Sequence, residues 1–192
     1  MAQTLTPALT LKDFLQLSET QPASEYINGR IFQKPMPQGK HSVLQTQLST
    51  TINSALQSVQ VAWAFSELRC TFGGRSTVPD IAVFVWERLP CDDNGEIADT
   101  FTDAPDWTIE ILSPDQNQTR VTKNILHCLQ HGSQMGWLID PEEQTVLVYL
   151  PPEQVKVFDQ PQQVLPAPSF AKEISVTVGD LFDWLVVRRL KT

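Results

Sequence analysis

Hydrophobic residues recur along this chain with two spacings, one typical of helices and the other of strands. Between His41 and Ser58 they fall three and four positions apart, which predicts an amphipathic helix. Further helices are expected at Leu9–Leu17, Thr119–Gln130 and Val178–Leu190. Thr10 is a candidate cap for the first of them, and Gly132 follows the second, where a C-terminal glycine is common.

Continuous apolar and β-branched runs predict the strands. These runs are Val61–Phe72, Val78–Trp86, Trp107–Leu112, Met135–Asp140, Thr145–Leu150 and a possible edge strand at Val155–Phe158. Asn28-Gly29 lies between two short strand patterns and predicts a hairpin turn. Helices and hairpins around one sheet indicate the α/β (mixed α+β) class, and we interpret residues 1–192 as a single domain.

Composition narrows the range of functions. A net charge of −8 argues against a protein that coats nucleic acid through general electrostatics, although it does not exclude a nuclease with an acidic metal site. The chain lacks a run of 18 apolar residues, so no membrane partner is expected. The first residues lack a signal-peptide pattern, and Cys70, Cys91 and Cys128 have no metal or disulfide spacing, so we expect a cytoplasmic protein.

Two of the apolar runs each contain a carboxylate where packing alone would favour a hydrophobic residue. Asp80 stands at the start of one strand, and Glu110 shares a face of the other with Thr108 and Leu112. Carboxylate and carbonyl oxygens suit Mg²⁺, so Asp80, Glu110 and the carbonyl of Ile111 form a candidate metal site. The alternative is that both acids lie at half-exposed strand ends and pair with arginine or lysine.

The order of several short motifs resembles the Uma2 (DUF820) family of the PD-(D/E)XK nuclease superfamily, a family common in cyanobacteria. The shared landmarks are Glu25-Tyr26-Ile27-Asn28-Gly29, His41, Pro79-Asp80, Glu110-Ile111-Leu112-Ser113-Pro114, Gly132 and Gly136-Trp137-Leu138-Ile139-Asp140-Pro141. The resemblance extends over roughly residues 8 to 185. It implies a restriction-endonuclease-like central mixed sheet flanked by helices.

The resemblance also implies a function. It points to a metal-dependent endonuclease that hydrolyses phosphodiester bonds in DNA, with Mg²⁺ (or Mn²⁺) bound by Asp80 and Glu110. Glu25 would reach the metal through water or be an ordinary surface acid. His41 would donate to a phosphate or orient Glu25, or be simply exposed at the start of its helix. We expect a homodimer.

The catalytic lysine departs from the family pattern. The superfamily usually has a lysine two residues after the glutamate, and this chain has Leu112 there. The helix lysine of Uma2 proteins aligns with Asn124, next to Lys123. Lys123 lies opposite the apolar stripe of its helix, so it is either the replacement catalytic lysine or a solvated side chain. Leu112 and Asn124 therefore keep open an alternative, a catalytically inactive nuclease-fold module that binds or regulates.

Scattered basic residues offer a second candidate feature. Lys34, Lys40, Arg69 and Arg75 could line a groove for phosphates, or they could be solubilising surface charges. His127 and His131 lie one helical turn apart but lack an evident third metal ligand, so a polar helix face is the preferred interpretation.

Overall fold

The computed structural model describes residues 9–114, 116–152 and 154–188, and it contains two sheets where the sequence pattern predicted one. The larger sheet has the strand order β10-β9-β8-β7-β6-β3. Its strands are β3 (Ala62–Ser66), β6 (Ile81–Val85), β7 (Trp107–Ile111), β8 (Met135–Asp140), β9 (Thr145–Leu150) and β10 (Gln154–Phe158). Only β7 and β8 pair in parallel, so the sheet is mixed.

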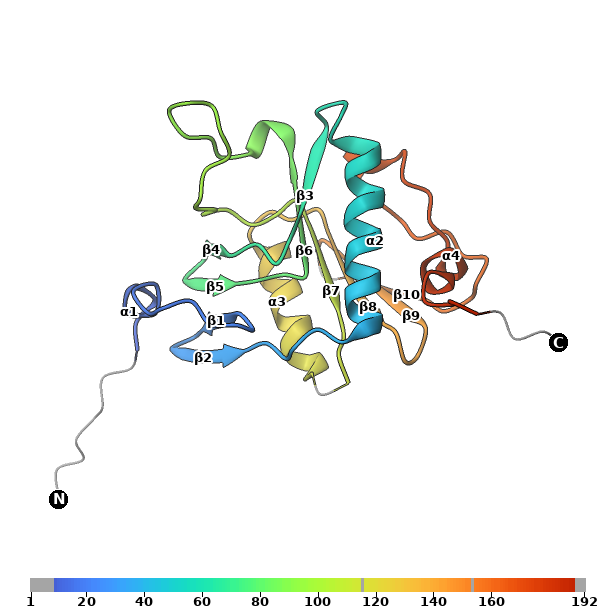
Figure 1. Cartoon of the computed structure of the whole chain (residues 1–192), viewed down its shortest axis with the longest axis horizontal. Coiled ribbons are helices and arrows are strands. Elements are labelled where there is room, and N and C mark those ends of the chain that lie inside the picture. Colours follow the sequence, from blue (N-terminus) through green and yellow to red (C-terminus); the bar gives the residue numbers. More distant parts are fainter. Residues whose placement is uncertain (1–8, 115, 153, 189–192) are drawn as a thin grey trace, which may run out of the picture.

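The smaller sheet has the order β2-β1-β5-β4 and lies beside the larger one (Figure 1). Its strands are β1 (Ser24–Ile27), β2 (Arg30–Gln33), β4 (Cys70–Phe72) and β5 (Arg75–Thr77). The turn between β1 and β2 is the expected Asn28-Gly29 pair, and both residues have positive φ.

Two long helices, α2 (Gly39–Leu56) and α3 (Gln118–Gln130), cover opposite faces of the larger sheet (Figure 1). The remaining helical segments are α1 (Leu11–Phe14), η1 (Trp86–Arg88), η2 (Ser169–Ala171) and α4 (Val178–Asp183). Thr10 caps α1 as predicted, because its side chain accepts a hydrogen bond from the Asp13 N–H. The last helix is shorter than expected, and residues 189–190 of the predicted range lie outside the described residues.

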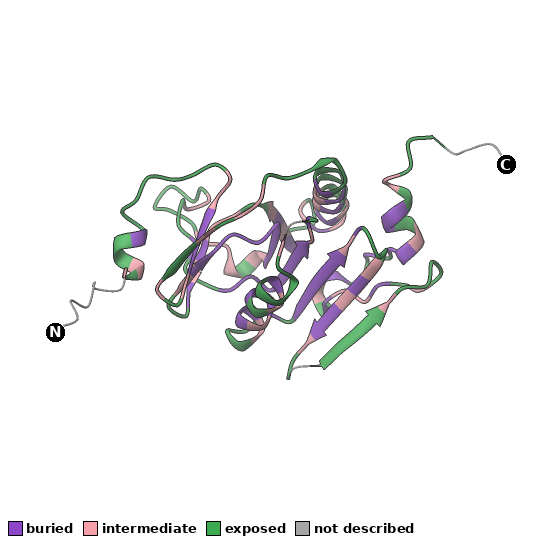
Figure 2. Cartoon of the chain, turned by 90° about the horizontal axis from the view of Figure 1, so that it is seen from below, coloured by how far each residue is buried: buried purple, intermediate pink, exposed green. Residues whose placement is uncertain are grey.

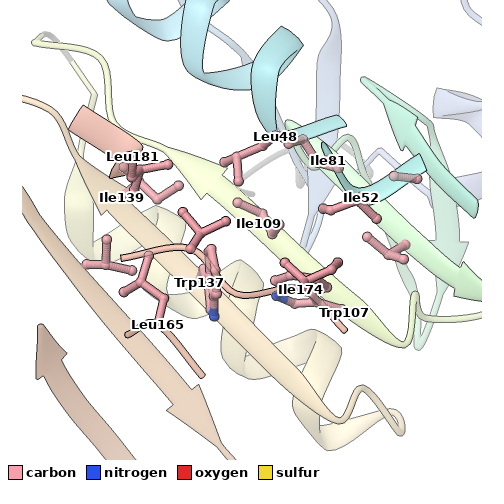
Figure 3. Packing of buried hydrophobic residues seen from close by; sticks show 14 of the residues in the cluster. Leu48, Ile52, Ile81, Trp107, Ile109, Trp137, Ile139, Leu165, Ile174 and Leu181 are labelled. Atoms are coloured by element: carbon pink, nitrogen blue, oxygen red, sulfur yellow. The ribbon is translucent and has the colours of Figure 1, made fainter. Parts of the chain in front are cut away.

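The face of β7 that meets α2 holds the main core. Trp107, Ile109 and Ile111 pack there with the α2 leucines. The Trp107 and Trp137 rings meet edge to face, with 4.8 Å between their centroids (Figure 3). Burial falls from the central strands to β10, which is largely exposed at the sheet edge (Figure 2). Because side chains alternate along a strand, Glu110 must face the other side, toward α3. No helix within the described residues is long and apolar enough to cross a membrane.

Candidate active site

Asp80 and Glu110 are brought together by strand register. Strands β6 and β7 are antiparallel, with Ile81 opposite Ile109, so the residue before β6 falls opposite Glu110. Both acids are buried, at 0% and 3% exposure. The two acids therefore lie side by side across neighbouring strands, and neither lies at a half-exposed strand end.

Lys34, the residue after β2, contacts both carboxylates. The Lys34 ammonium donates to Asp80 Oδ1 at 2.6 Å and to the Val78 carbonyl at 2.7 Å, and it lies 3.7 Å from Glu110 Oε2. Sequence reasoning had considered Lys34 only as a candidate for a phosphate groove. Its role beside Asp80 had no local signal, because the contact spans 46 residues and two sheets.

Asp80 is the most completely bonded acid of the site. Its Oδ2 accepts from the Ile111 N–H at 2.7 Å and lies 3.1 Å from His41 Nε2. Burial alone would raise the pKa of Asp80, but Lys34 and His41 outweigh it and hold this pKa well below its usual value. Asp80 is therefore an anion that the fold has fixed in place.

The pKa of Glu110 is shifted in the opposite direction from that of Asp80. Burial raises its pKa well above the ordinary value, and the neighbouring Asp80 and Glu25 add to the rise. Lys34 offsets only part of it. The two acids of the pair thus differ in proton affinity, as expected for carboxylates that share a pocket.

Glu25 closes the site from β1. Its two carboxylate oxygens accept from the Val78 N–H at 2.9 Å and from the Asn124 side-chain amide at 3.1 Å. Burial raises the pKa of Glu25, while Lys34 opposes the rise. Glu25 is 5% exposed, so the interpretation as an ordinary surface acid was wrong.

His41 faces a different acid from the one expected. It lies in the first turn of α2, is 5% exposed, and contacts Asp80 instead of Glu25. Gln45, one turn later, donates to the Asp80 backbone carbonyl at 2.8 Å. The start of α2 therefore fixes both the side chain and the main chain of Asp80.

Lys123 does not join this group. It is exposed, as its helical phase predicted, and the neighbouring Asn124 turns inward to Glu25. Among the other basic candidates, Lys40 pairs with Glu142 and Arg69 with Glu19. The lysine beside the acid pair is therefore Lys34, which follows β2, and not Lys123 from α3.

The acidic side chains of the site are the candidate ligands for a divalent cation. Glu25, Asp80 and Glu110 are three buried carboxyl groups near the Lys34 ammonium, and the raised pKa values of Glu25 and Glu110 favour the protonated forms of these two. No cluster of three or more histidine, cysteine or acidic residues close enough to hold a metal is found in the described part of the chain. A metal would thus rest on Asp80 and Glu110, with backbone and water oxygens as the remaining ligands. The Lys34 ammonium lies between the two carboxylates and must shift for one ion to contact both.

Comparison with known proteins agrees with this geometry. The Uma2 family profile, described as "Putative restriction endonuclease", matches residues 11–179. The chain belongs to the Uma2 family. It is also similar to the crystal structure of "a putative nuclease belonging to DUF820 from Anabaena variabilis", with 63% identity and a TM-score of 0.92 over 93% of this chain and 99% of that one. No protein with a curated description matches. The nuclease-like α/β fold and the Uma2 resemblance are therefore confirmed.

Proposed function

We propose that this Uma2 protein is an endonuclease that hydrolyses phosphodiester bonds in DNA with Mg²⁺ or Mn²⁺ at Asp80 and Glu110. One observation carries the proposal. Two buried carboxylates lie opposite each other in the register of neighbouring strands, and one lysine ammonium contacts both. Such a set is costly to bury without a function, because each charge loses its hydration.

Asp80 and Glu110 have different roles in the proposed reaction. Asp80, held as an anion by His41 and the Ile111 N–H, is the permanent negative ligand. Glu110 has the higher proton affinity and is the group able to exchange a proton with a water or leaving oxygen. A bound divalent cation would supply Lewis-acid polarisation of the scissile phosphate and a more acidic water.

Lys34 provides the positive charge that Leu112 cannot. Its ammonium reaches the acid pair from the end of β2, and its pKa is raised because Asp80 and Glu110 outweigh the effect of burial. It is therefore charged throughout the working pH range. We assign it to neutralising the charge that develops on the phosphate oxygens.

The alternative is a nuclease-fold module that does not cleave. The close Lys34–Asp80 bond favours this interpretation, since in the present conformation the ammonium already neutralises Asp80. The absence of lysine at positions 112 and 124 points the same way.

Nicking of supercoiled plasmid DNA with Mn²⁺ separates the two. The wild type should nick, Asp80→Asn and Glu110→Gln should fall to background, and Lys34→Gln should lose about 100- to 1000-fold in rate. Lys156→Gln on the exposed β10 is the control and should match the wild type. A folded wild type that binds Mn²⁺ but leaves several DNA substrates intact would favour the inactive module.

A further inference from the structure

Four cationic side chains line a groove beside the acid pocket. The groove has a volume of ≈ 700 Å³ and runs between the β1–β2 hairpin, β5 and the N-terminal half of α3. Its basic residues are Arg30, Arg75, Arg120 and Lys123. No acidic side chain lines it.

These four cations have no acidic partner among the described residues. Within the described residues none of them forms an ion pair, whereas Lys40, Arg69 and Arg88 each pair with a carboxylate. The chain has 14 basic against 22 acidic residues, so partners for surface cations are plentiful. Concentrating unpaired positive charge in one groove of such an acidic protein favours an anionic ligand there.

The groove adjoins the candidate active site on the side of Glu110. A smaller pocket lined by Glu25, Lys34 and Glu110 shares Phe32, Arg120 and Asn124 with the groove. The Arg120 guanidinium lies over the Phe32 ring, 4.2 Å from its centre. This stacked pair stands where the groove meets the acid pocket.

A buried polar atom at the same place lacks a partner. Asn124 is 5% exposed and donates to Glu25, but its Oδ1 accepts no hydrogen bond from the described residues. A buried acceptor without a donor is costly, so the position suits a hydroxyl or water that arrives with a ligand. The first turn of α3 adds backbone N–H groups and the positive end of the helix dipole, with Asn117 and Thr119 on the groove wall.

We propose that this groove binds the phosphate backbone of a single strand of DNA and leads it toward Glu110 of the acid pair. Arg30, Arg75, Arg120 and Lys123 contact the phosphates. Phe32 stacks on one base once Arg120 swings from the ring to the backbone, because charged grooves with aromatic platforms bind single strands in this way. The proposal rests on the proposed nuclease function and names the path by which the substrate reaches the site.

Binding measured in EDTA tests the groove without requiring hydrolysis. The probe is a fluorescein-labelled single-stranded oligodeoxynucleotide, followed by anisotropy over a range of salt concentrations. The double variant Arg30→Ala/Arg75→Ala should bind at least about tenfold more weakly, and its log–log salt slope should shrink by about 0.7 for each lost phosphate contact. The charge-matched control Lys156→Ala/Lys172→Ala lies far from the groove and should bind like the wild type.

Phe32→Leu tests the stacking separately. It should weaken binding several-fold with an unchanged salt slope, because it removes a stacking surface and no charge. Thermal unfolding of each variant checks that the fold is retained. Equal binding by the groove variant and its control would overturn the groove, and an unaltered affinity of Phe32→Leu would overturn the stacking.

The outcomes for the groove and for hydrolysis are distinguishable. If the wild type binds DNA through the groove but does not nick it, only the proposed hydrolysis is overturned. If the protein nicks DNA and the groove variants still bind it like the wild type, only the groove proposal is overturned.

Discussion

Glu110 is the residue at which function and stability oppose each other. Burial raises its pKa well above the ordinary 4.5, so the folded protein prefers the protonated form. Below the pKa of the unfolded chain the carboxyl is neutral in both states and carries no penalty. As the pH rises through and beyond that value, the unfolded state ionises freely and the folded state loses stability.

We therefore expect Glu110→Gln to raise the free energy of unfolding in EDTA at pH 8, although it removes a proposed metal ligand. The gain should shrink as the pH falls toward 4.5, because the wild-type carboxyl is then protonated as well. Urea unfolding at several pH values measures this. A variant that is less stable than the wild type at pH 8 would contradict the assigned pKa direction.

Substitution of Lys34, in contrast, should lower the stability of the folded protein. Removing one partner of a buried ion pair costs about 3–5 kcal/mol, because the remaining carboxylates are left uncompensated. Lys34→Ala should lose stability of this order at pH 8, and the loss should diminish in acid as Glu25 and Glu110 become protonated. The comparison is Lys40→Ala, whose exposed pair with Glu142 should change stability by less than about 1 kcal/mol. Equal losses in the two variants would argue against a buried role for Lys34.

At the scale of elements, the sequence predicted the helices and strands that bury a continuous apolar face. It missed the strand boundary that depends on contacts with other parts of the chain. The periodicity of α2 and the apolar runs of β7 and β8 were sufficient, because each buries a continuous stripe. The run Val61–Phe72 was wrong as one strand. It breaks at Glu67, which has a φ of 52°, and its two halves, β3 and β4, join different sheets.

Contacts from elsewhere in the chain accompany that break. The Glu67 N–H donates to the Asp80 carbonyl at 3.1 Å. Arg69 donates to the Ser24 carbonyl and the Ser76 hydroxyl, both at about 3 Å. All of these partners lie outside the run Val61–Phe72, so a hydrophobic pattern read along the run could not reveal the division.

The packing of α3 on β8 yields an element-scale prediction. A Cβ at Gly136 would lie 2.3 Å from Ile125 Cγ2, so the helix approaches the strand closely only because this residue is glycine. Gly136→Ala should displace α3, destabilise the protein by about 1–3 kcal/mol, and disturb the Asn124–Glu25 bond on the same helix. The control is Gly39→Ala in the first turn of α2, where nothing lies within 4 Å and a small gain in stability is expected. Denaturant unfolding measures the free energy of unfolding of both variants. A Gly136→Ala protein as stable as the wild type would contradict the close approach of α3 to β8.

At the scale of the whole molecule, the site was predictable only where its residues lie in recognisable runs. Asp80 and Glu110 stood out because each interrupts an apolar strand, and the strands proved to be neighbours. Lys34 has no such setting, and it reaches the acids through the placement of the smaller sheet against the larger one. Of the groove's arginines the sequence suggested only Arg75 for phosphate binding, because Arg30, Arg75 and Arg120 come from β2, β5 and α3.

The buried acid pair leads to a prediction for the whole protein. A ligand that binds only the folded state stabilises it by about 2.7 kcal/mol when present at 100 times its dissociation constant. Mn²⁺ should therefore raise the unfolding temperature of the wild type, and calorimetry should show proton release, because Glu110 must lose its proton to bind metal.

The difficulty is that a protein with a net charge of −8 also attracts Mn²⁺ to its surface. Two glutamine variants with the same change of charge resolve this. Glu142→Gln removes an exposed acid and should keep both the thermal shift and the proton release, whereas Glu110→Gln should lose both. Equal responses from the two variants would place the metal on the surface and leave Asp80 and Glu110 without the role proposed for them. A response lost only with Glu110 would show that the buried pair holds the ion, whether or not the protein cuts DNA.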